Sequence, residues 1–500
     1  MTIHTQTAVL DGYGVKPVTI EGDSNRGLPR VEIIGLANKI IEESRSRIRS
    51  ALINSGFTFP QEHIIINLAP AEIHKTGPHL DLAIAAVLLA LSRQLLPQDL
   101  DQTMFLGELG LNGEIKPIRG IISLLDYAND RHFKTIYIPS KNTKEAQLLN
   151  TKSQIIPVNN LQELWQNIKN ITHISPLKQN VKITETEIKS DTFDQIIGQD
   201  HAKRALTIAI AGRHNLLMSG PPGSGKTALA KCALSLLPPL TTKERIEITK
   251  LNSLISSNNS LAVSRPFRSP HNTASRNAIL GGGHQLLPGE ISLATHGILF
   301  LDELPEFRRD VLEALRQPME DKKIILNHTG HSATYPCNFL LLATANPCPC
   351  GYRNSQNRAC ICTQPQLQRY RQKFSGPLLD RIDMQIVVNQ QPTSVLVNST
   401  TSGKYQYETA KSKIAKALAA QVKRFGKDKY NANLNSFETS KLIKLNSTRD
   451  FLARCTRELQ LSARAFFKLI RIARTIADID AAPEILPSHF AEALQYRQAF

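Results

Sequence analysis

One short segment carries the residue types that bind phosphates. Residues 220–227 read Gly-Pro-Pro-Gly-Ser-Gly-Lys-Thr, after a mostly apolar run at 215–218 and before helix-forming residues at 228–231. Glycines let backbone N–H groups close around phosphates, lysine reaches the β- and γ-phosphates, and the threonine hydroxyl binds magnesium at a helix N-terminus. We therefore predict a site for ATP and Mg²⁺ formed by Gly220, Pro221, Pro222, Gly223, Ser224, Gly225, Lys226 and Thr227.

Two acidic residues follow a second apolar run. Residues 297–301 read Gly-Ile-Leu-Phe-Leu and lead directly into Asp302 and Glu303. Such a run predicts a buried strand of a parallel sheet with the two carboxylates at its end. There Asp302 would hold Mg²⁺, directly or through water, and Glu303 would polarise the attacking water. The pair predicts hydrolysis as well as binding.

An amide and a guanidinium complete the candidate catalytic set. A third apolar run, residues 339–345, leads to Asn346 at the same edge of the predicted sheet. An amide there can orient the water or the γ-phosphate. Arg381 lies in the segment 376–383, and a guanidinium is suited to stabilising charge on a transferred phosphoryl group.

Seven cysteines are spread too unevenly to form a disulfide framework. Three stand alone, and we expect them to be buried thiols: Cys232, Cys337 and Cys455. The other four form two Cys-x-Cys pairs in one polar loop at 348–362: Cys348, Cys350, Cys360 and Cys362. Four thiolates in one loop suit tetrahedral Zn²⁺, although a single residue between ligands is tighter than the usual spacing. The alternative is a set of reduced thiols in a cytosolic loop.

Length and composition set the frame for these motifs. The 500 residues exceed what one hydrophobic core holds and suggest about three domains. The amino terminus lacks a signal-peptide pattern, and the longest apolar run, 82–91, is too short to span a membrane, so we expect a soluble, cytoplasmic protein. Lys and Arg outnumber Asp and Glu by 60 to 43, a net charge of +17 that attracts polyanions, although charge alone specifies no partner.

The apolar patterns divide the chain into an α/β protein of several parts. Residues 1–175 mix strands at 30–34 and 63–68 with helices at 40–54 and 81–91, as in an independent α+β domain. Residues 176–192 are polar and predict a linker. Residues 193–390 hold the phosphate-binding motifs, and 391–500 are largely helical, with apolar residues at helical spacing in 408–424 and 463–478.

The order of these motifs resembles an AAA+ ATPase of the magnesium-chelatase and MCM-helicase branch. Further segments narrow the resemblance to the ComM/YifB family: 265–271 (Arg-Pro-Phe-Arg-Ser-Pro-His), 281–283 (Gly-Gly-Gly), 288–294 (Pro-Gly-Glu-Ile-Ser-Leu-Ala) and 346–351 (Asn-Pro-Cys-Pro-Cys-Gly). The resemblance runs through essentially the whole chain. It implies an AAA+ P-loop core, and residues 196–200 before the first core helix resemble its adenine-side segment.

The resemblance also implies a function. The ComM/YifB family is bacterial and associated with DNA branch migration during natural transformation, so we expect a ring-forming, hexameric DNA translocase or helicase. Its partners would be single-stranded or branched DNA and further copies of the chain, with no membrane partner. By motif position, Arg381 would act on the neighbouring subunit's nucleotide, and Arg464 would be a lid arginine that touches the γ-phosphate of its own subunit.

The first domain resembles the Lon-protease (S5-like) fold but departs from it at the catalytic positions. Residues 75–80 (Lys-Thr-Gly-Pro-His-Leu) match the stretch that carries the protease's nucleophilic serine, yet His79 occupies that place. Residues 113–122 match the segment with the catalytic lysine, yet Ile122 stands there. A serine–lysine dyad needs both partners, so we expect a non-proteolytic scaffold or nucleic-acid platform.

Two questions stay open at the level of sequence. Four cations of residues 463–478 fall near one helix face: Arg464, Lys468, Arg471 and Arg474. Apart from Arg464, whose motif position indicates the nucleotide, they form either a solvated basic face or a DNA-contacting stripe. Two other functions remain as well. A chelatase-type motor would drive metal insertion with the same core, and an ATP-dependent protease or unfoldase would couple the core to the first domain.

Overall fold

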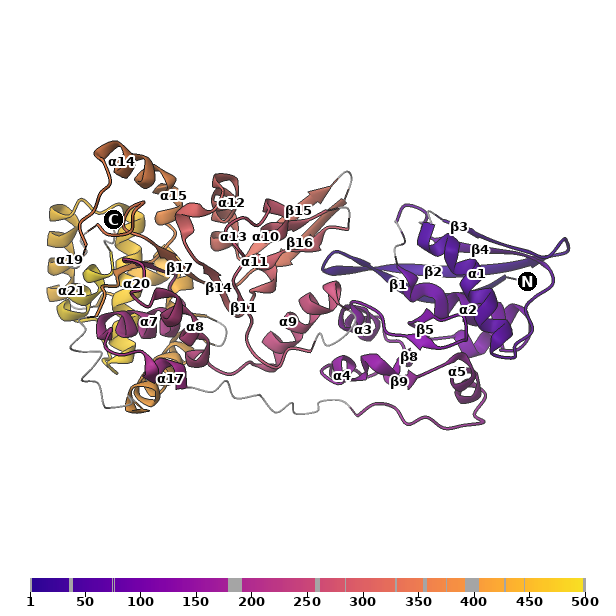
Figure 1. Cartoon of the computed structure of the whole chain (residues 1–500). Helices are drawn as coiled ribbons and strands as arrows, with labels where there is room; N and C mark the ends of the chain where they lie inside the picture. The colour runs from indigo at the N-terminus through magenta and orange to yellow at the C-terminus, as the bar shows by residue number, and fades with distance from the viewer. Residues whose placement is uncertain are drawn as a thin grey trace.

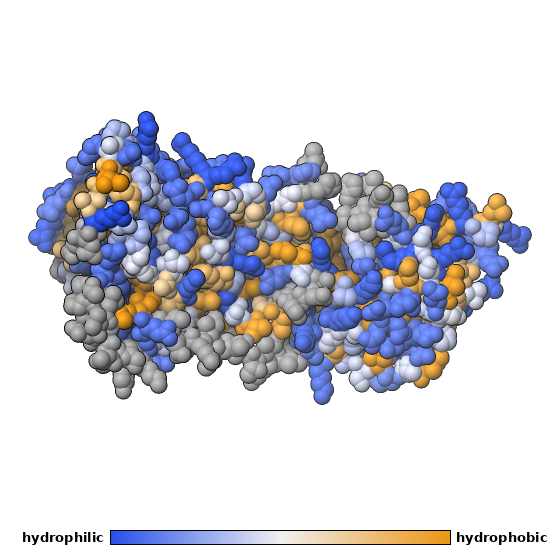
Figure 2. Space-filling model, in the orientation of Figure 1, coloured by the Kyte–Doolittle hydropathy of each residue, from blue (hydrophilic) through white to orange (hydrophobic). Residues whose placement is uncertain are grey.

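The computed structural model describes residues 2–35, 39–73, 75, 77–178, 191–256, 261–283, 285–328, 331–353, 358–374, 376–391, 404–426, 429–444 and 446–497. Most of the predicted linker, 176–192, lies outside these ranges. The molecule is elongated, with the amino-terminal domain at one end and the carboxyl-terminal helices at the other (Figure 1). On the face drawn in Figure 2, apolar residues appear in small groups scattered among polar ones.

The first domain is built on a four-stranded sheet in the order β1-β2-β4-β3. Its strands are β1 (Thr2–Asp11), β2 (Gly14–Asn25), β3 (Arg30–Ile34) and β4 (His63–Ala69), and only the β3–β4 pair is parallel. α1 (Lys39–Asn54) and α2 (Asp81–Leu91) pack with this sheet. Every residue of α2 from Asp81 to Ala90 is buried, as its almost unbroken apolar sequence requires.

A second layer of the first domain is a small parallel sheet. It consists of β5 (Thr103–Phe105), β8 (Thr135–Pro139) and β9 (Gln154–Val158) in that order. Three helices join this layer: α3 (Ile121–Asp130), α4 (Thr143–Ala146) and α5 (Leu161–Ile168). A two-stranded ribbon links β5 to α3 and is formed by β6 (Glu108–Leu109) and β7 (Ile115–Lys116).

The phosphate-binding motifs lie on a five-stranded sheet in the order β11-β14-β17-β10-β18, in which every neighbouring pair is parallel. Its strands are β11 (Phe267–Arg268), β14 (Ile298–Leu301), β17 (Leu340–Ala345), β10 (Leu216–Ser219) and β18 (Met384–Val387). β10, β14 and β17 are buried along their whole length, as predicted from their apolar runs. Parallel strands bring their carboxyl ends to one edge of the sheet.

Helices flank the sheet, and two hairpins extend from it. α6 (Asp191–Gln195), α7 (Asp200–Gly212) and α8 (Lys226–Leu236) precede or follow β10. α9 (Thr242–Ile255) leads toward β12 (Gly281–Gly282) and β13 (Leu287–Pro288), between α10 (Arg276–Leu280) and α11 (Glu290–Leu293). After β14 come η4 (Leu304–Glu306), α12 (Arg309–Ala314), α13 (Arg316–Asp321) and the hairpin of β15 (Lys323–His328) and β16 (His331–Pro336).

α9 and the β15–β16 hairpin reach the first domain (Figure 1). Lys250 on α9 pairs with Asp126 on α3 (Nζ to Oδ2, 2.5 Å), and the Gly120 N–H donates to the Ser253 carbonyl (2.9 Å). At the turn between β1 and β2, the Tyr13 ring meets the Tyr335 ring of β16 edge-on, with centroids 6.2 Å apart. The two domains therefore touch through specific side chains.

The carboxyl-terminal region is helical. It contains α17 (Lys404–Phe425), α18 (Ser436–Ser440), α19 (Asn446–Glu458), α20 (Ala463–Ile479) and α21 (Pro487–Gln495). α17 and α20 pack on α7, so their apolar faces belong to the same core as β10. Among the described residues, no helix is both long and apolar enough to cross a membrane.

Three of the four basic residues of α20 are packed inside the protein, so the expectation of a solvated or DNA-contacting stripe is wrong for them. Lys468 donates to the Ile382 carbonyl (2.9 Å), and Arg471 donates to the Ala432 carbonyl (3.3 Å). Arg474 is buried and forms an ion pair with Asp478 (2.8 Å). Long cationic stems can cover apolar surface while their charged ends reach carbonyls or carboxylates.

Candidate active site

The phosphate loop connects β10 to α8, as predicted. Gly223 and Gly225 take positive φ angles of 75° and 89°, which few other residues adopt without strain. The Lys226 ammonium donates to the carbonyls of Gly220 (2.7 Å) and Pro221 (2.8 Å). Burial lowers the pKa of Lys226, while Asp302 and Glu303 act in the opposite direction. The loop thus has the backbone curvature and the cation that a nucleotide's phosphates require.

Asp302 lies between two threonine hydroxyls. Its Oδ2 accepts from the Thr227 hydroxyl (3.2 Å), and its Oδ1 accepts from the Thr344 hydroxyl (2.5 Å). Thr227 is the second residue of α8, and Asp302 directly follows β14. The sequence-predicted Mg²⁺ ligands are therefore neighbours, and their oxygen atoms suit this cation.

Glu303 has an unusual backbone conformation. Its φ and ψ are both 54°, in the left-handed region that non-glycine residues seldom occupy. Its N–H donates to the Thr344 hydroxyl (3.0 Å). One buried hydroxyl on β17 thus contacts both acidic residues of the site. The sequence analysis missed Thr344, and the available signal was a polar residue within the apolar run 339–345.

Asn346 follows β17 at the edge that also holds the phosphate loop. The Gly220 N–H donates to the carbonyl of the preceding residue, Ala345 (3.2 Å). The Asn346 carbonyl accepts from the Tyr370 hydroxyl (2.9 Å) on α14 (Gln364–Lys373). Gln199, in the segment identified as adenine-side, donates through Nε2 to the Ser224 carbonyl (3.2 Å). The loop is therefore fixed from two sides.

Arg381 lies near the amino ends of the strands, whereas the phosphate loop lies at their carboxyl ends. It is in the turn between α15 (Gly376–Leu379) and β18, and the nearby Asp383 accepts the N–H of Asn215 at the start of β10 (3.0 Å). β10 pairs with β18 along its four residues, from Leu216 to Ser219. Those residues separate Arg381 from the phosphate loop by about 13 Å of strand. This position agrees with an arginine that does not serve its own subunit's nucleotide.

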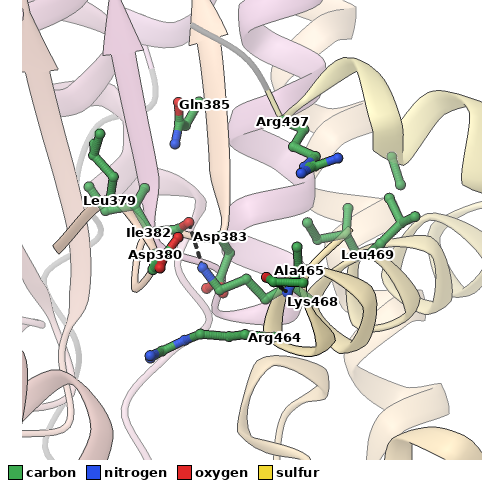
Figure 3. Close-up of a pocket in the computed structure, with 13 residues that line it drawn as sticks. Leu379, Asp380, Ile382, Asp383, Gln385, Arg464, Ala465, Lys468, Leu469 and Arg497 are labelled. Atoms are coloured by element: carbon green, nitrogen blue, oxygen red, sulfur yellow. Dashed lines mark hydrogen bonds and ion pairs between the residues drawn. The ribbon is translucent and has the colours of Figure 1, made fainter. Parts of the chain in front are cut away.

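Arg464, the predicted lid arginine, lies beside Arg381 rather than beside the phosphate loop of its own chain. Both guanidiniums donate to one carboxylate, that of Glu320 on α13. One turn along α20, Lys468 reaches the Ile382 carbonyl, which anchors this part of the helix at the amino ends of the strands. In Figure 3, Arg464 and Lys468 extend from α20 toward Asp380 and Asp383. The sequence identifies the motif that contains Arg464, but the packing of α20 determines near which end of the strands this side chain lies.

The four cysteines of the loop at 348–362 converge. Their Sγ atoms all lie within 4.8 Å of one another, with 3.3 Å between Cys348 and Cys350 and 3.6 Å between Cys350 and Cys360. Thiolates around a tetrahedral zinc ion are about 3.8 Å apart, given Zn–S bonds of about 2.3 Å. The residues therefore fit this metal. The other three cysteines are buried thiols, as predicted.

The cysteine loop touches the phosphate loop. A Cβ atom on Gly351, whose φ is 83°, would lie 2.7 Å from Cδ of Pro222, so the two segments are in close contact. Gln390 Nε2 also donates to the Pro222 carbonyl (2.9 Å). A metal in the cysteine cluster would therefore brace one side of the phosphate loop.

The residues at the positions where the sequence resemblance would place a Lon-type dyad are not suited to nucleophilic catalysis. His79 is buried on η1 (Pro78–Leu80), and its Nε2 lies 3.2 Å from the Ala8 carbonyl. Burial lowers the pKa of His79 to about 4, so the imidazole is neutral near pH 7. Ile122 is buried in α3, and the ammonium of the buried Lys75 donates to the Gly35 carbonyl (2.9 Å). These positions hold packed side chains.

Comparison with known proteins shows which family has this sequence. Three family models match successive parts of the chain: subunit ChlI of Mg-chelatase at 20–142, magnesium chelatase subunit ChlI at 192–396, and the ChlI C-terminal part at 405–497. Competence protein ComM of Haemophilus influenzae is 41% identical over 488 residues, which cover 96% of this chain and 94% of that protein. The chain belongs to the ComM/YifB family. YifB of Escherichia coli is 40% identical over 499 residues, covering 99% and 96%.

Membership of the ComM/YifB family makes this a magnesium-chelatase-type AAA+ protein with an ATPase core. A more distant similarity joins it to Lon protease 2 of Bacillus subtilis, which is 26% identical over 155 residues, or 29% of this chain and 28% of that protein.

Proposed function

We propose that the protein is an ATP-hydrolysing, ring-forming DNA translocase or helicase that promotes branch migration during recombination in natural transformation. One observation carries the hydrolytic part of this proposal: Lys226, Thr227, Asp302 and Glu303 meet at one edge of the sheet, whereas Arg381 lies at the other. A site divided in this way becomes complete when a second copy of the chain places its Arg381 next to the phosphate loop of the first copy.

The residues take separate roles in this proposal. Bound Mg²⁺ supplies charge neutralisation for the phosphates. Lys226 and the loop N–H groups hold the phosphates, Thr227 and Asp302 offer oxygens to the metal, and Glu303 accepts a proton from the attacking water. Asn346 orients that water. Arg381 acts on the neighbouring subunit's nucleotide, and its proximity to Arg464 supports the same role in trans for Arg464.

The proposed domain roles follow from the same arrangement. Residues 1–175 would be a Lon-protease-like scaffold, 193–390 the motor and 391–500 a helical lid, with 176–192 as linker. Zn²⁺ in the cysteine loop would be structural. The net charge of +17 and the similarity to a competence protein support DNA as the partner of a hexameric ring.

The experiment that tests this function measures ATP hydrolysis with and without DNA. We expect single-stranded or branched DNA to raise turnover by the purified full-length chain, and we expect Lys226→Ala to remove hydrolysis in both conditions. If neither form of DNA changes turnover, the translocase proposal is wrong. A chelatase-type motor, which the magnesium-chelatase family models favour, then becomes the better account.

A further inference from the structure

One carboxylate joins the two arginines that we place in the neighbour's site. Glu320, near the end of α13, accepts from Arg381 Nη2 through Oε2 (2.8 Å) and from Arg464 Nη2 through Oε1. The three residues come from separate elements, α13, the turn after α15, and α20. Glu320 was not predicted to be a functional residue, because it belongs to no nucleotide-binding motif in the sequence.

The environment of this trio keeps it charged and accessible. The side chains of Glu320 and Arg464 are 43% and 41% exposed, whereas that of Arg381 is 16% exposed. Partial burial raises the pKa of Glu320, but hydrogen bonds from Arg381 and Arg464 outweigh this effect and lower it overall. The carboxylate is therefore ionised at neutral pH, and it faces two permanent cations.

Arg381 is held on two sides and retains a donor. Its Nη1 donates to the Pro377 carbonyl (2.8 Å), and its Nη2 donates to Glu320. Its Nε is buried and has no hydrogen-bond partner among the residues that the structure describes, so it is not open to an incoming phosphate. A guanidinium has five N–H groups in a fixed plane, so the two contacts orient the plane and leave one N–H on each of Nη1 and Nη2 for a further anion.

Two guanidiniums this close repel each other unless an anion lies between them. Glu320 supplies that anion and sets the spacing, since each of its two oxygens accepts from one arginine. A terminal phosphate has several oxygens that can receive such a pair of cations. We propose that Glu320 is a positioning residue that holds Arg381 and Arg464 side by side, so that both reach the terminal phosphate of a neighbouring subunit's nucleotide. This inference rests on the proposed action of Arg381 in trans.

The first test is Glu320→Gln in the full chain. The amide keeps one acceptor oxygen but turns an N–H₂ group toward one guanidinium, so it can hold only one of the two arginines. We expect kcat to fall by about 10- to 100-fold, the cost of a misplaced catalytic group. We expect the KM for ATP to stay within about threefold of that of the unaltered protein, because the phosphate loop lies at the other end of the strands from Glu320.

A matched control separates positioning from loss of surface charge. Glu114 of the first domain is a carboxylate of similar exposure, 45% against 43% for Glu320, and it pairs with Lys141 (3.1 Å), away from both arginines. Glu114→Gln should leave turnover unchanged. Because Glu320 is well exposed, both variants should melt within a few degrees of the unaltered protein. Turnover by Glu320→Gln equal to or above normal would overturn the inference.

Mixed assemblies provide the decisive readout. Lys226→Ala subunits cannot hydrolyse ATP, but they carry an intact Glu320 and both arginines. Added to Glu320→Gln subunits, they should raise turnover per Glu320→Gln subunit several-fold, because an intact arginine pair then faces an intact phosphate loop. A merely structural defect within the altered subunit would not respond to its neighbours.

A parallel mixture separates this inference from the proposed function. Arg381→Ala subunits mixed with Lys226→Ala subunits should regain hydrolysis if Arg381 acts in trans. Recovery there, without recovery for Glu320→Gln, overturns the role of Glu320 alone. No recovery in either mixture, with mixed assemblies demonstrated, overturns action in trans and the role of Glu320 together.

Discussion

A single buried hydroxyl connects the two acidic residues of the active site. Thr344 donates to Asp302 and accepts from the backbone of Glu303, whose left-handed conformation costs about 1–3 kcal/mol unless its surroundings support it. The hydroxyl therefore helps to fix a strained residue at the point where water must be activated. Neither contact involves the nucleotide, so the role of Thr344 is one of positioning.

Replacement of this hydroxyl by a methyl group tests its role. Thr344→Val keeps the shape but removes one donor and one acceptor from a buried site, so we expect turnover to fall by about 10- to 100-fold. Thr344→Ser retains the hydroxyl and should restore at least half of normal turnover. ATP binding, measured by fluorescent-nucleotide titration, should change little in either variant. Equal turnover by the valine and serine variants would contradict this prediction.

Glu303 is the predicted base. Glu303→Gln keeps the side chain's size and should still bind ATP, yet its amide cannot accept the water's proton, so turnover should fall by about 10²- to 10⁴-fold. Steady-state hydrolysis and equilibrium ATP binding measure the two effects separately. Turnover within tenfold of the unaltered protein would rule out Glu303 as the base.

Residue types and spacing predicted the acidic pair and the phosphate loop because their chemistry is local to single strand–loop segments. Thr344 escaped notice because a threonine in a strand is ordinary, and its partners come from a different strand. The position of Arg464 beside Arg381 could not be predicted for a related reason. The contact of Lys468 on α20 with the Ile382 carbonyl joins distant segments, which helical spacing alone does not encode.

At the scale of elements, the cysteine loop is notable for its position against the phosphate loop. Gly351, within the cysteine loop, touches Pro222, and Tyr370 on the following α14 donates to the Asn346 carbonyl, so the loop and the helix after it both contact the catalytic site. Loss of order in this loop would thus remove support from both the phosphate loop and Asn346.

Metal analysis tests the zinc prediction. Purified protein, dialysed against buffer that was freed of metals by chelation, should retain about one zinc per chain. Cys360→Ser should lower the zinc content and raise the KM for ATP, because the phosphate loop loses its brace. Ser440→Ala, a change in an exposed hydroxyl of α18, serves as a control. A metal-free protein with full ATPase activity would contradict the zinc prediction and favour the alternative, that the four cysteines are reduced thiols.

Three of the five strands of the ATPase sheet, β10, β14 and β17, were predicted within a residue or two because each is a short apolar run before a motif, whereas β11 and β18 were not predicted. The two hairpins were not predicted, since β12 and β13 have only two residues each and β15 alternates apolar and polar residues near the surface. Short pairings of this kind are set by their partners rather than by local sequence.

At the scale of the whole molecule, the first domain is joined to the motor by packing as well as by the chain. The Lys250–Asp126 ion pair and the contact of Tyr13 with Tyr335 tie it to α9 and to the β15–β16 hairpin, both of which belong to the ATPase core. Composition indicated separate domains but carried no information on this contact, because its residues are 124 and about 320 positions apart.

The net charge of +17 predicts how the protein would bind DNA. The sequence feature that favours DNA is diffuse positive charge rather than a base-reading motif, so we expect contacts to phosphates to dominate. The logarithm of the binding constant should then fall with the logarithm of salt concentration, by roughly 0.7 to 0.9 per phosphate neutralised. Fluorescence anisotropy with oligonucleotides of different sequence, at several salt concentrations, measures this slope. Affinity should depend little on sequence, and binding that is insensitive to salt would contradict a phosphate-gripping translocase.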